Sequence, residues 1–176
     1  MKSFLAFALV LLSSVVNIAF QPRAVAAIST SEGVAVPVSE GPVFTTTGAF
    51  FALSVRDATA SAKWYAEKLG LKVVMNLPKS DKTAVIVLEG GGLIVELIQH
   101  DDALPLRIAA PSVNDPMYVH GITKVGIIVD DLDQTLKRLK ERQVSVAYGP
   151  FPKSAEQRAN LIIRDNAGNL IQFFGK

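Results

Sequence analysis

The stretch that decides the fold is residues 50–74, FFALSVRDATASAKWYAEKLGLKVV. Its opening alternates large and small side chains and predicts a strand over residues 50–55. A helix is expected over residues 59–69, ending at Gly70, which favours a helix stop. Residues 71–76 then read as a second strand. The buried stripe of the helix is expected to consist of Ala58, Ala62, Tyr65 and Leu69.

Two more strands complete this unit, at residues 83–88 and 93–98, and the glycines at 90–92 between them read as a hairpin turn. The same order returns after a connection. The second unit is expected to contain a strand at 122–129, a helix at 132–142, and strands at 144–148, 158–164 and 170–174. The sequence therefore predicts an α+β fold of two βαβββ modules: module one over 49–100, a connection over 101–121, and module two over 122–176.

Aligning the two halves by register supports an internal repeat. An offset of 74 places Val55-Arg56-Asp57 on Val129-Asp130-Asp131, and an offset of 76 places Glu96 on Gln172. A two-residue gap in an intervening hairpin accounts for the change of offset. Equivalent positions of the two modules should therefore have equivalent places in the fold.

Residues 1–26 read as a secretory signal peptide, because an apolar run over 4–20 is followed by the small-x-small pattern Ala24-Val25-Ala26. Polar residues interrupt the run, which favours cleavage over a membrane anchor of about 20 apolar residues. We expect an exported protein, periplasmic or secreted, with an N-terminal extension at 27–48 before a domain at 49–176.

Composition excludes several classes of function. Removing the signal peptide takes away two basic residues, which leaves sixteen basic and sixteen acidic ones. A neutral chain without a basic stripe is not expected to bind nucleic acid. Because the chain has no cysteine, it has no disulfide, thiolate nucleophile or cysteine-ligated metal site.

The segments FFALSVRD, SAKWYAEKLGLKVV and RDNAGNLIQFF together resemble the vicinal oxygen chelate superfamily, which includes glyoxalase I, bleomycin-resistance proteins, fosfomycin-resistance enzymes and extradiol dioxygenases. The likeness covers about residues 50–176. It implies that the modules form a curled mixed sheet around a cup, with the helices outside. In metal-dependent members, each module supplies one metal ligand from its first strand and one from its last.

The four positions that correspond to those ligands are Phe50, Glu96, Lys124 and Gln172. A phenyl ring cannot coordinate a metal, and a protonated lysine repels a divalent ion, so only Glu96 is a good ligand. We therefore expect no cofactor, while a residual or shifted divalent metal site stays open. His100 lies four residues beyond Glu96 along a strand, so its imidazole is too distant to share one ion with the Glu96 carboxylate. His120 is expected to lie in a loop.

Strand alternation divides the side chains between two faces. The more uniformly apolar sets, such as Phe51, Leu53 and Val55, should pack under the helices. The cup is then expected to be lined by Phe50, Ala52, Ser54, Ile94, Glu96, Ile98, Lys124, Gly126, Ile128, Leu170, Gln172 and Phe174. Within it, we expect the Lys124 ammonium to pair with Glu96 and to donate to Gln172.

An apolar cup with a few polar groups is typical of small-molecule sites. We therefore expect the protein to bind a small, partly apolar ligand. Two alternatives stay open: an enzyme of glyoxalase, lyase or dioxygenase type, with Glu96 and Lys124 as weak catalytic candidates, and an interaction module with a filled cup. The sequence also leaves homodimerisation open.

Overall fold

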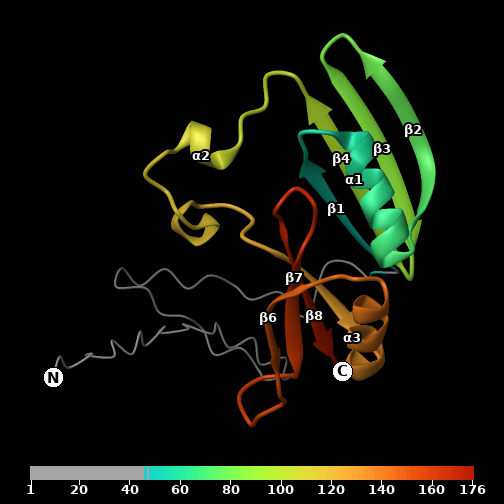
Figure 1. The fold of residues 1–176 in the computed structure, drawn as a ribbon, viewed down its shortest axis with the longest axis vertical. Coiled ribbons are helices and arrows are strands. Elements are labelled where there is room, and N and C mark those ends of the chain that lie inside the picture. The colour runs from blue at the N-terminus through green and yellow to red at the C-terminus, as the bar shows by residue number, and fades with distance from the viewer. Residues whose placement is uncertain (1–45, 47) are drawn as a thin grey trace, which may run out of the picture.

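The computed structural model describes residue 46 and residues 48–176, and Figure 1 shows their course. The predicted signal peptide and nearly all of the predicted extension lie outside the described residues. The first unit comprises β1 (Ala49–Ser54), α1 (Ala58–Trp64), the π-helical turn η1 (Tyr65–Leu69), β2 (Lys72–Ser80), β3 (Thr83–Gly90) and β4 (Leu93–His100).

The second unit repeats this order after a connection that contains two short helical turns. The connection holds α2 (Leu106–Ala109) and η2 (Pro116–Tyr118), and the unit comprises β5 (Val125–Val129), α3 (Leu132–Glu141), β6 (Val146–Phe151), β7 (Asn160–Arg164) and β8 (Leu170–Gly175). The predicted α+β fold of tandem βαβββ modules is confirmed. None of the helices in residues 46 and 48–176 is long and apolar enough to cross a membrane.

Each unit forms one four-stranded mixed sheet. The strand orders are β1-β4-β3-β2 and β5-β8-β7-β6, with the first and last strand of each unit paired in parallel and the other neighbours antiparallel. The order in the second sheet is the order in the first with each number raised by four. The repeat found in the sequence is therefore a repeat of topology.

The two long helices also begin in the same way. The Asp57 carboxylate accepts a hydrogen bond of 2.8 Å from the backbone N–H of Ala60, and the Asp131 carboxylate accepts one of the same length from Gln134. Each aspartate thereby satisfies an N–H in the first turn that has no partner within the helix. The offset of 74 aligns these two caps, which confirms the register of the repeat.

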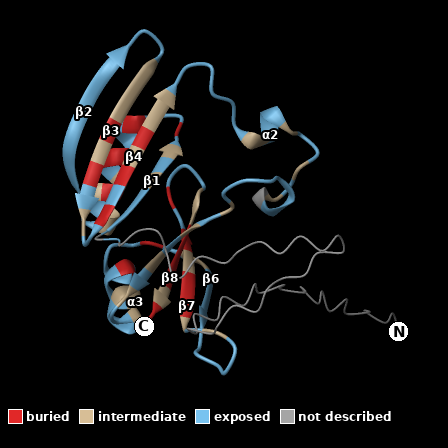
Figure 2. Ribbon diagram, turned by 180° about the vertical axis from the view of Figure 1, so that it is seen from behind, coloured by how far each residue is buried: buried red, intermediate tan, exposed pale blue. Residues whose placement is uncertain are grey.

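The core lies between each sheet and its helix. Figure 2 shows buried residues along β3, β4, β7 and β8 and on the helix sides that face them. Fully buried members, with no exposed surface, are Tyr65, Leu88, Val95, Leu97, Leu161, Ile163 and Ile171. The apolar alternation predicted for the helix-covered faces is confirmed, and Tyr65 is buried as expected for the helix stripe. Trp64 is partly buried and packs against the same core.

Several predicted boundaries were wrong by two residues or more, among them the start of β7, which lies at Asn160 rather than at residue 158. β2 runs through Pro78 to Ser80, because it is an edge strand, where a residue without an N–H is tolerated; the β2–β3 register shifts there. β5 begins only at Val125, and Ile122 before it is 83% exposed. β6 begins at Val146 rather than at residue 144.

The units contact each other through the first helix of one and the β7–β8 turn of the other. The Tyr65 hydroxyl donates to the Asp165 carboxylate over 2.9 Å, and the Asn166 amide donates to the Ser61 hydroxyl over 3.2 Å. Lys68 Nζ also donates to the Arg142 carbonyl over 2.7 Å. The turn at residues 165–169 therefore joins the modules.

Candidate functional site

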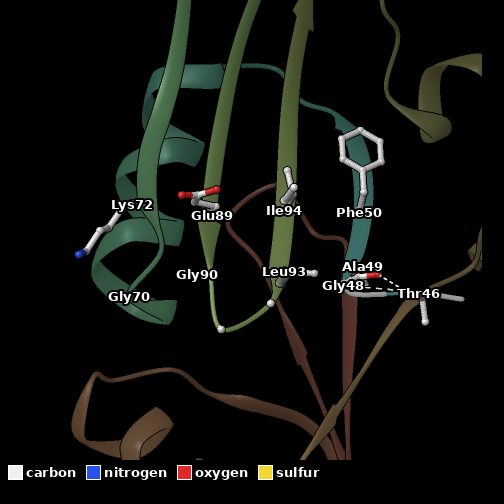
Figure 3. A pocket seen from close by; sticks show the side chains of 12 residues that line it. Thr46, Gly48, Ala49, Phe50, Gly70, Lys72, Glu89, Gly90, Leu93 and Ile94 are labelled. Carbon is white, nitrogen blue, oxygen red and sulfur yellow. Dashed lines mark hydrogen bonds between the residues drawn. The ribbon is translucent and has the colours of Figure 1, made fainter.

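The face of the first sheet opposite α1 is open to solvent, and its side chains form rows across the strands. The row at the lower end in Figure 3 joins Phe50, Ile94, Glu89 and Lys72, which the strand register places side by side. Phe50 is 61% exposed and Ile94 is 40% exposed. The row borders a shallow depression that is closed below by the glycine turn at residues 90–92.

The next row of this face contains its central acidic group. Ala52 lies opposite Glu96, Glu96 opposite Val87, and Val87 opposite Met75. Glu96 is half-buried, and none of the ion pairs among the described residues includes it. This open face therefore holds a carboxylate among aliphatic side chains.

The corresponding face of the second sheet is richer in aromatic residues. Its open side includes Ile128, Tyr148 and Phe151, which are 58%, 45% and 40% exposed. At its rim the Arg164 guanidinium lies 5.8 Å from the centre of the Tyr148 ring and donates to the Tyr148 hydroxyl over 3.1 Å. Both contacts hold the ring in place, and the cation lies on its π face.

A buried amide lies within this second face. Gln172 is 6% exposed, and its Nε2 donates to Asn160 Oδ1 over 2.8 Å. Asn160 Nδ2 in turn donates to the Arg158 carbonyl over 3.0 Å. The remaining amide oxygen, Gln172 Oε1, is buried and has no hydrogen-bond partner among the residues that the structure describes. Most buried polar atoms in folded proteins have one, so this atom is exceptional.

The predicted lining residues lie on the open faces, but on two sheets. Phe50, Ala52, Ser54, Ile94, Glu96 and Ile98 belong to the first sheet, and Gly126, Ile128, Leu170, Gln172 and Phe174 to the second, with Lys124 directly before β5. Strand alternation on the first and last strands identified them. The inner and outer strands add residues that the sequence reasoning missed: Met75, Leu77, Val85, Val87 and Glu89 on the first face, and Tyr148, Phe151, Asn160 and Ile162 on the second.

The predicted contacts of Lys124 are not formed. Among the described residues, no ion pair joins Lys124 to Glu96 and no hydrogen bond joins it to Gln172. Lys124 is exposed, so its ammonium stays hydrated, which is favourable for a cation. Glu96 lies on the other sheet, so the pair would have to form between the two modules.

The four positions do not fit a divalent cation. Glu96 is the one strong ligand among them, and no group of three or more histidine, cysteine or acidic side chains in the described part of the chain is arranged to hold a metal. Both histidines lie at the surface, so neither joins Glu96 in a site. His100 and His120 are exposed, and His100 Nδ1 accepts from the Asp102 backbone N–H over 3.1 Å.

Comparison with known proteins identifies one family and many solved structures that have the same fold. A family model described as the Glyoxalase/Bleomycin resistance protein/Dioxygenase superfamily matches residues 48–173. No curated protein matches the chain.

Three solved structures illustrate the likeness in fold. A glyoxylase/bleomycin resistance protein/dioxygenase domain from Frankia sp. EAN1pec is 21% identical, with a TM-score of 0.57, over 77% of this chain and 94% of that one. TnmS3, an antibiotic binding protein from Streptomyces sp. CB03234, is 20% identical, with a TM-score of 0.52, over 77% and 98%. A glyoxalase family protein from Enterococcus faecalis is 18% identical, with a TM-score of 0.57, over 75% and 98%.

Proposed function

This chain belongs to the Glyoxalase/Bleomycin resistance protein/Dioxygenase superfamily, and we propose that it binds a small, partly apolar ligand without a metal ion. The observation that carries the proposal is the pair of open sheet faces, each apolar over most of its width with very few polar groups. Exposed apolar surface gathered on one open sheet face is typical of a binding site. Fold alone does not decide function, because this architecture serves many activities.

A structural neighbour supports the same class of function. TnmS3 is described as an antibiotic binding protein, and it shares the fold over nearly its whole length. An antibiotic that offers apolar surface together with a few polar groups would match the chemistry of both open faces. Binding that sequesters such a molecule needs no catalytic group and no metal.

The donor set at the four ligand positions supports independence from metal. Phe50 offers no donor atom, Gln172 offers at most a neutral amide oxygen in place of a charged ligand, and Lys124 adds positive charge. Glu96 alone would hold such an ion weakly. A metal-dependent lyase or dioxygenase reaction therefore has little support in these residues.

We also propose that a second copy of the chain closes each open face. The first face carries two acidic residues, Glu89 and Glu96, and one basic residue, Lys72, so its net charge is negative. The second face carries Arg164, with Lys124 beside it, so the two faces are complementary in charge. Sedimentation equilibrium should then show a dimer. Ile128→Lys should dissociate it, whereas Gln134→Lys, on the exposed side of α3, should not; a monomer at all concentrations would contradict the proposal.

Export is the remaining part of the proposal. The apolar segment before residue 26 would direct secretion, so the protein would meet its ligand outside the cytoplasm. Expression of the whole gene followed by N-terminal sequencing of the product should give a chain that starts at Ala27. A product that retains Met1 would refute this part without affecting the others.

The binding function is tested by titrating the purified mature chain with planar aromatic compounds, including phenols, aromatic amides and indoles. A rise in melting temperature with saturable chemical-shift changes on the open faces is expected. Ile94→Asp should weaken the binding of compounds to the first face. The matched control is Ile108→Asp in the exposed connection, which should leave their binding unchanged. Absence of binding by any compound would leave the interaction module as the better interpretation.

A metal measurement distinguishes binding from metal-dependent catalysis. The chain is loaded with nickel, zinc, manganese and iron, freed of excess, and analysed by elemental mass spectrometry. We expect far less than one ion per chain. Near-stoichiometric metal that Glu96→Ala removes would overturn the proposal and point to an enzyme.

A further inference from the structure

The hydrogen bonds around Gln172 fix which way its amide points. The Arg158 carbonyl can only accept, so the Asn160 side chain must turn its Nδ2 toward it. Asn160 Oδ1 then faces Gln172, which must offer its Nε2. The assignment of the two amides follows from the backbone carbonyl rather than from their shapes. Gln172 Oε1 is therefore the end of the chain of bonds, and it is the atom left without a donor.

None of the residues that the structure describes donates a hydrogen bond to this oxygen, and its direct neighbours on the open face carry no donor. In the strand register its direct neighbours are Gly126 on β5 and Ile162 on β7. The ring of Phe174 lies over Gly126, since a Cβ at that glycine would be 3.5 Å from the Phe174 Cε2 atom. The Tyr148 hydroxyl, beyond Ile162, accepts from Arg164, and no hydrogen bond among the described residues joins its own O–H to Gln172. A buried acceptor in this setting is completed by a group that comes from outside the sheet.

We propose that Gln172 Oε1 accepts a hydrogen bond from the N–H or O–H of an uncharged aromatic ligand bound on the open face of the second sheet. The ligand reaches the oxygen when the half-buried Phe174 ring swings away from Gly126. This inference rests on the proposed binding function and names the ligand class. Asn160 is a positioning residue, because it holds the amide so that the oxygen and not the nitrogen faces the ligand.

The charge and shape of the face select this ligand class. Tyr148, Phe151 and Phe174 offer ring surfaces for a planar ligand, and aromatic pairs are stabilised by offset or edge contacts. Arg164 at the rim disfavours a cation. A deprotonated group has no proton to give to Gln172, so the end of the ligand that reaches the oxygen is uncharged. A neutral heterocycle with an N–H, or a phenol, meets all three conditions.

The test uses two probes that differ in one donor. Indole has an N–H and no competing acceptor of similar strength, while N-methylindole has the same ring without the donor. Binding of each to the mature chain is followed by chemical-shift titration and by displacement calorimetry. We expect indole to bind about tenfold more tightly than N-methylindole, as one neutral hydrogen bond in a buried site provides. In Gln172→Met the two affinities should agree within about twofold, while Gln134→Met on α3 should keep the wild-type ratio.

Each outcome decides a different point. Equal binding of both probes by the wild-type chain overturns the inference and leaves the binding function in place. Binding of neither probe, nor of the wider panel of aromatic compounds, overturns both. If the wild-type chain binds both probes equally and only Lys124→Met prefers indole, the Lys124 ammonium donates to Gln172 Oε1 in solution. That result would overturn the assignment of this oxygen to a ligand. Because the probes compare affinities on the unmutated chain, the result does not depend on the folding of Gln172→Met.

Discussion

The buried contact between Tyr65 and Asp165 gives the sharpest prediction about stability, because it joins the two modules. The Tyr65 side chain has no exposed surface, and its hydroxyl donates to Asp165 Oδ2 over 2.9 Å. Asp165 also accepts from the backbone N–H groups of Ala167 and Asn169, at 2.9 and 2.8 Å, and from the Asn169 amide at 2.8 Å. The carboxylate therefore orders its own turn and holds the first helix against it.

These contacts set the expected magnitudes. A hydrogen bond to a charged group contributes about 1.5–3 kcal/mol, and Tyr65→Phe leaves Asp165 three donors, so the loss should be about 1.5–2 kcal/mol. Asp165→Ala leaves the Tyr65 hydroxyl and the donors of the turn without a partner, so about 3–5 kcal/mol is expected. The control is Tyr118→Phe, since Tyr118 is 74% exposed. That change should alter the free energy of unfolding by less than about 0.5 kcal/mol.

Urea denaturation between pH 7 and 11 tests how large the contribution of Tyr65 to the free energy of unfolding is and in which direction it changes with pH. Burial, followed by the charge of Asp165 and its hydrogen bond, raises the pKa of Tyr65 far above its ordinary value of 10.0. In the unfolded chain the tyrosine loses its proton near pH 10, whereas in the folded chain it keeps it. The unfolded state then binds fewer protons, so stability falls as the pH rises above 10, by at most about 1.4 kcal/mol per pH unit.

The comparison of wild type with Tyr65→Phe isolates this effect from the titration of lysines. The stability difference between the two proteins should be constant below pH 9 and should shrink above pH 10. A difference that stays constant to pH 11 would show that Tyr65 ionises alike in both states, and a loss below about 0.5 kcal/mol at pH 7 would refute the structural role.

Three further predictions concern local features of the fold. Asp57→Ala and Asp131→Ala should each lower the free energy of unfolding by about 1 kcal/mol, additively, in urea denaturation, because each removes an equivalent helix cap; loss at one site alone would contradict the repeat. Gly70→Ala should destabilise by about 1–2 kcal/mol in the same assay, since φ is +78° and the new Cβ would lie 2.8 Å from an Arg142 side-chain nitrogen; an unchanged midpoint would show that the turn relaxes. Lys63→Met should change thermal stability by less than about 0.5 kcal/mol, because its ion pair with Glu67 is exposed on one helix; a larger loss would indicate an unrecognised contact.

The sequence predicted the fold because the repeat constrains it twice. One strand-helix-strand pattern is ambiguous, but its return at a fixed offset, with aspartates at both helix starts, leaves few arrangements. The boundaries that failed lie where local signals are weak. Pro78 suggested a turn, yet an edge strand does not need its N–H. Ile122 looked like part of a strand, but its apolar side chain is exposed in the connection.

The site was predicted less completely, for a physical reason. Alternation assigns the face of each residue, and it placed Glu96 and Gln172 correctly on open faces. It does not say which strands lie beside them, so Tyr148 and Phe151 were missed until the register brought them next to β7. The expected contact of Lys124 with Glu96 failed because position along a strand carries no information on the distance between two sheets.

The repeat also explains why the two faces differ chemically. Glu96 lies opposite Ala52 in the first sheet as Gln172 lies opposite Gly126 in the second, so backbone geometry gives both side chains the same position. Glu96 is nevertheless half-exposed and Gln172 buried. A carboxylate must keep water or gain a partner to stay charged, whereas burying a neutral amide costs less than burying a charge. The Gln172 donor is paired with Asn160, and its oxygen is left without a partner among the described residues. Equivalent positions thus present a hydrated charge on one face and a dehydrated acceptor on the other, and a ligand held between such faces would be oriented by both.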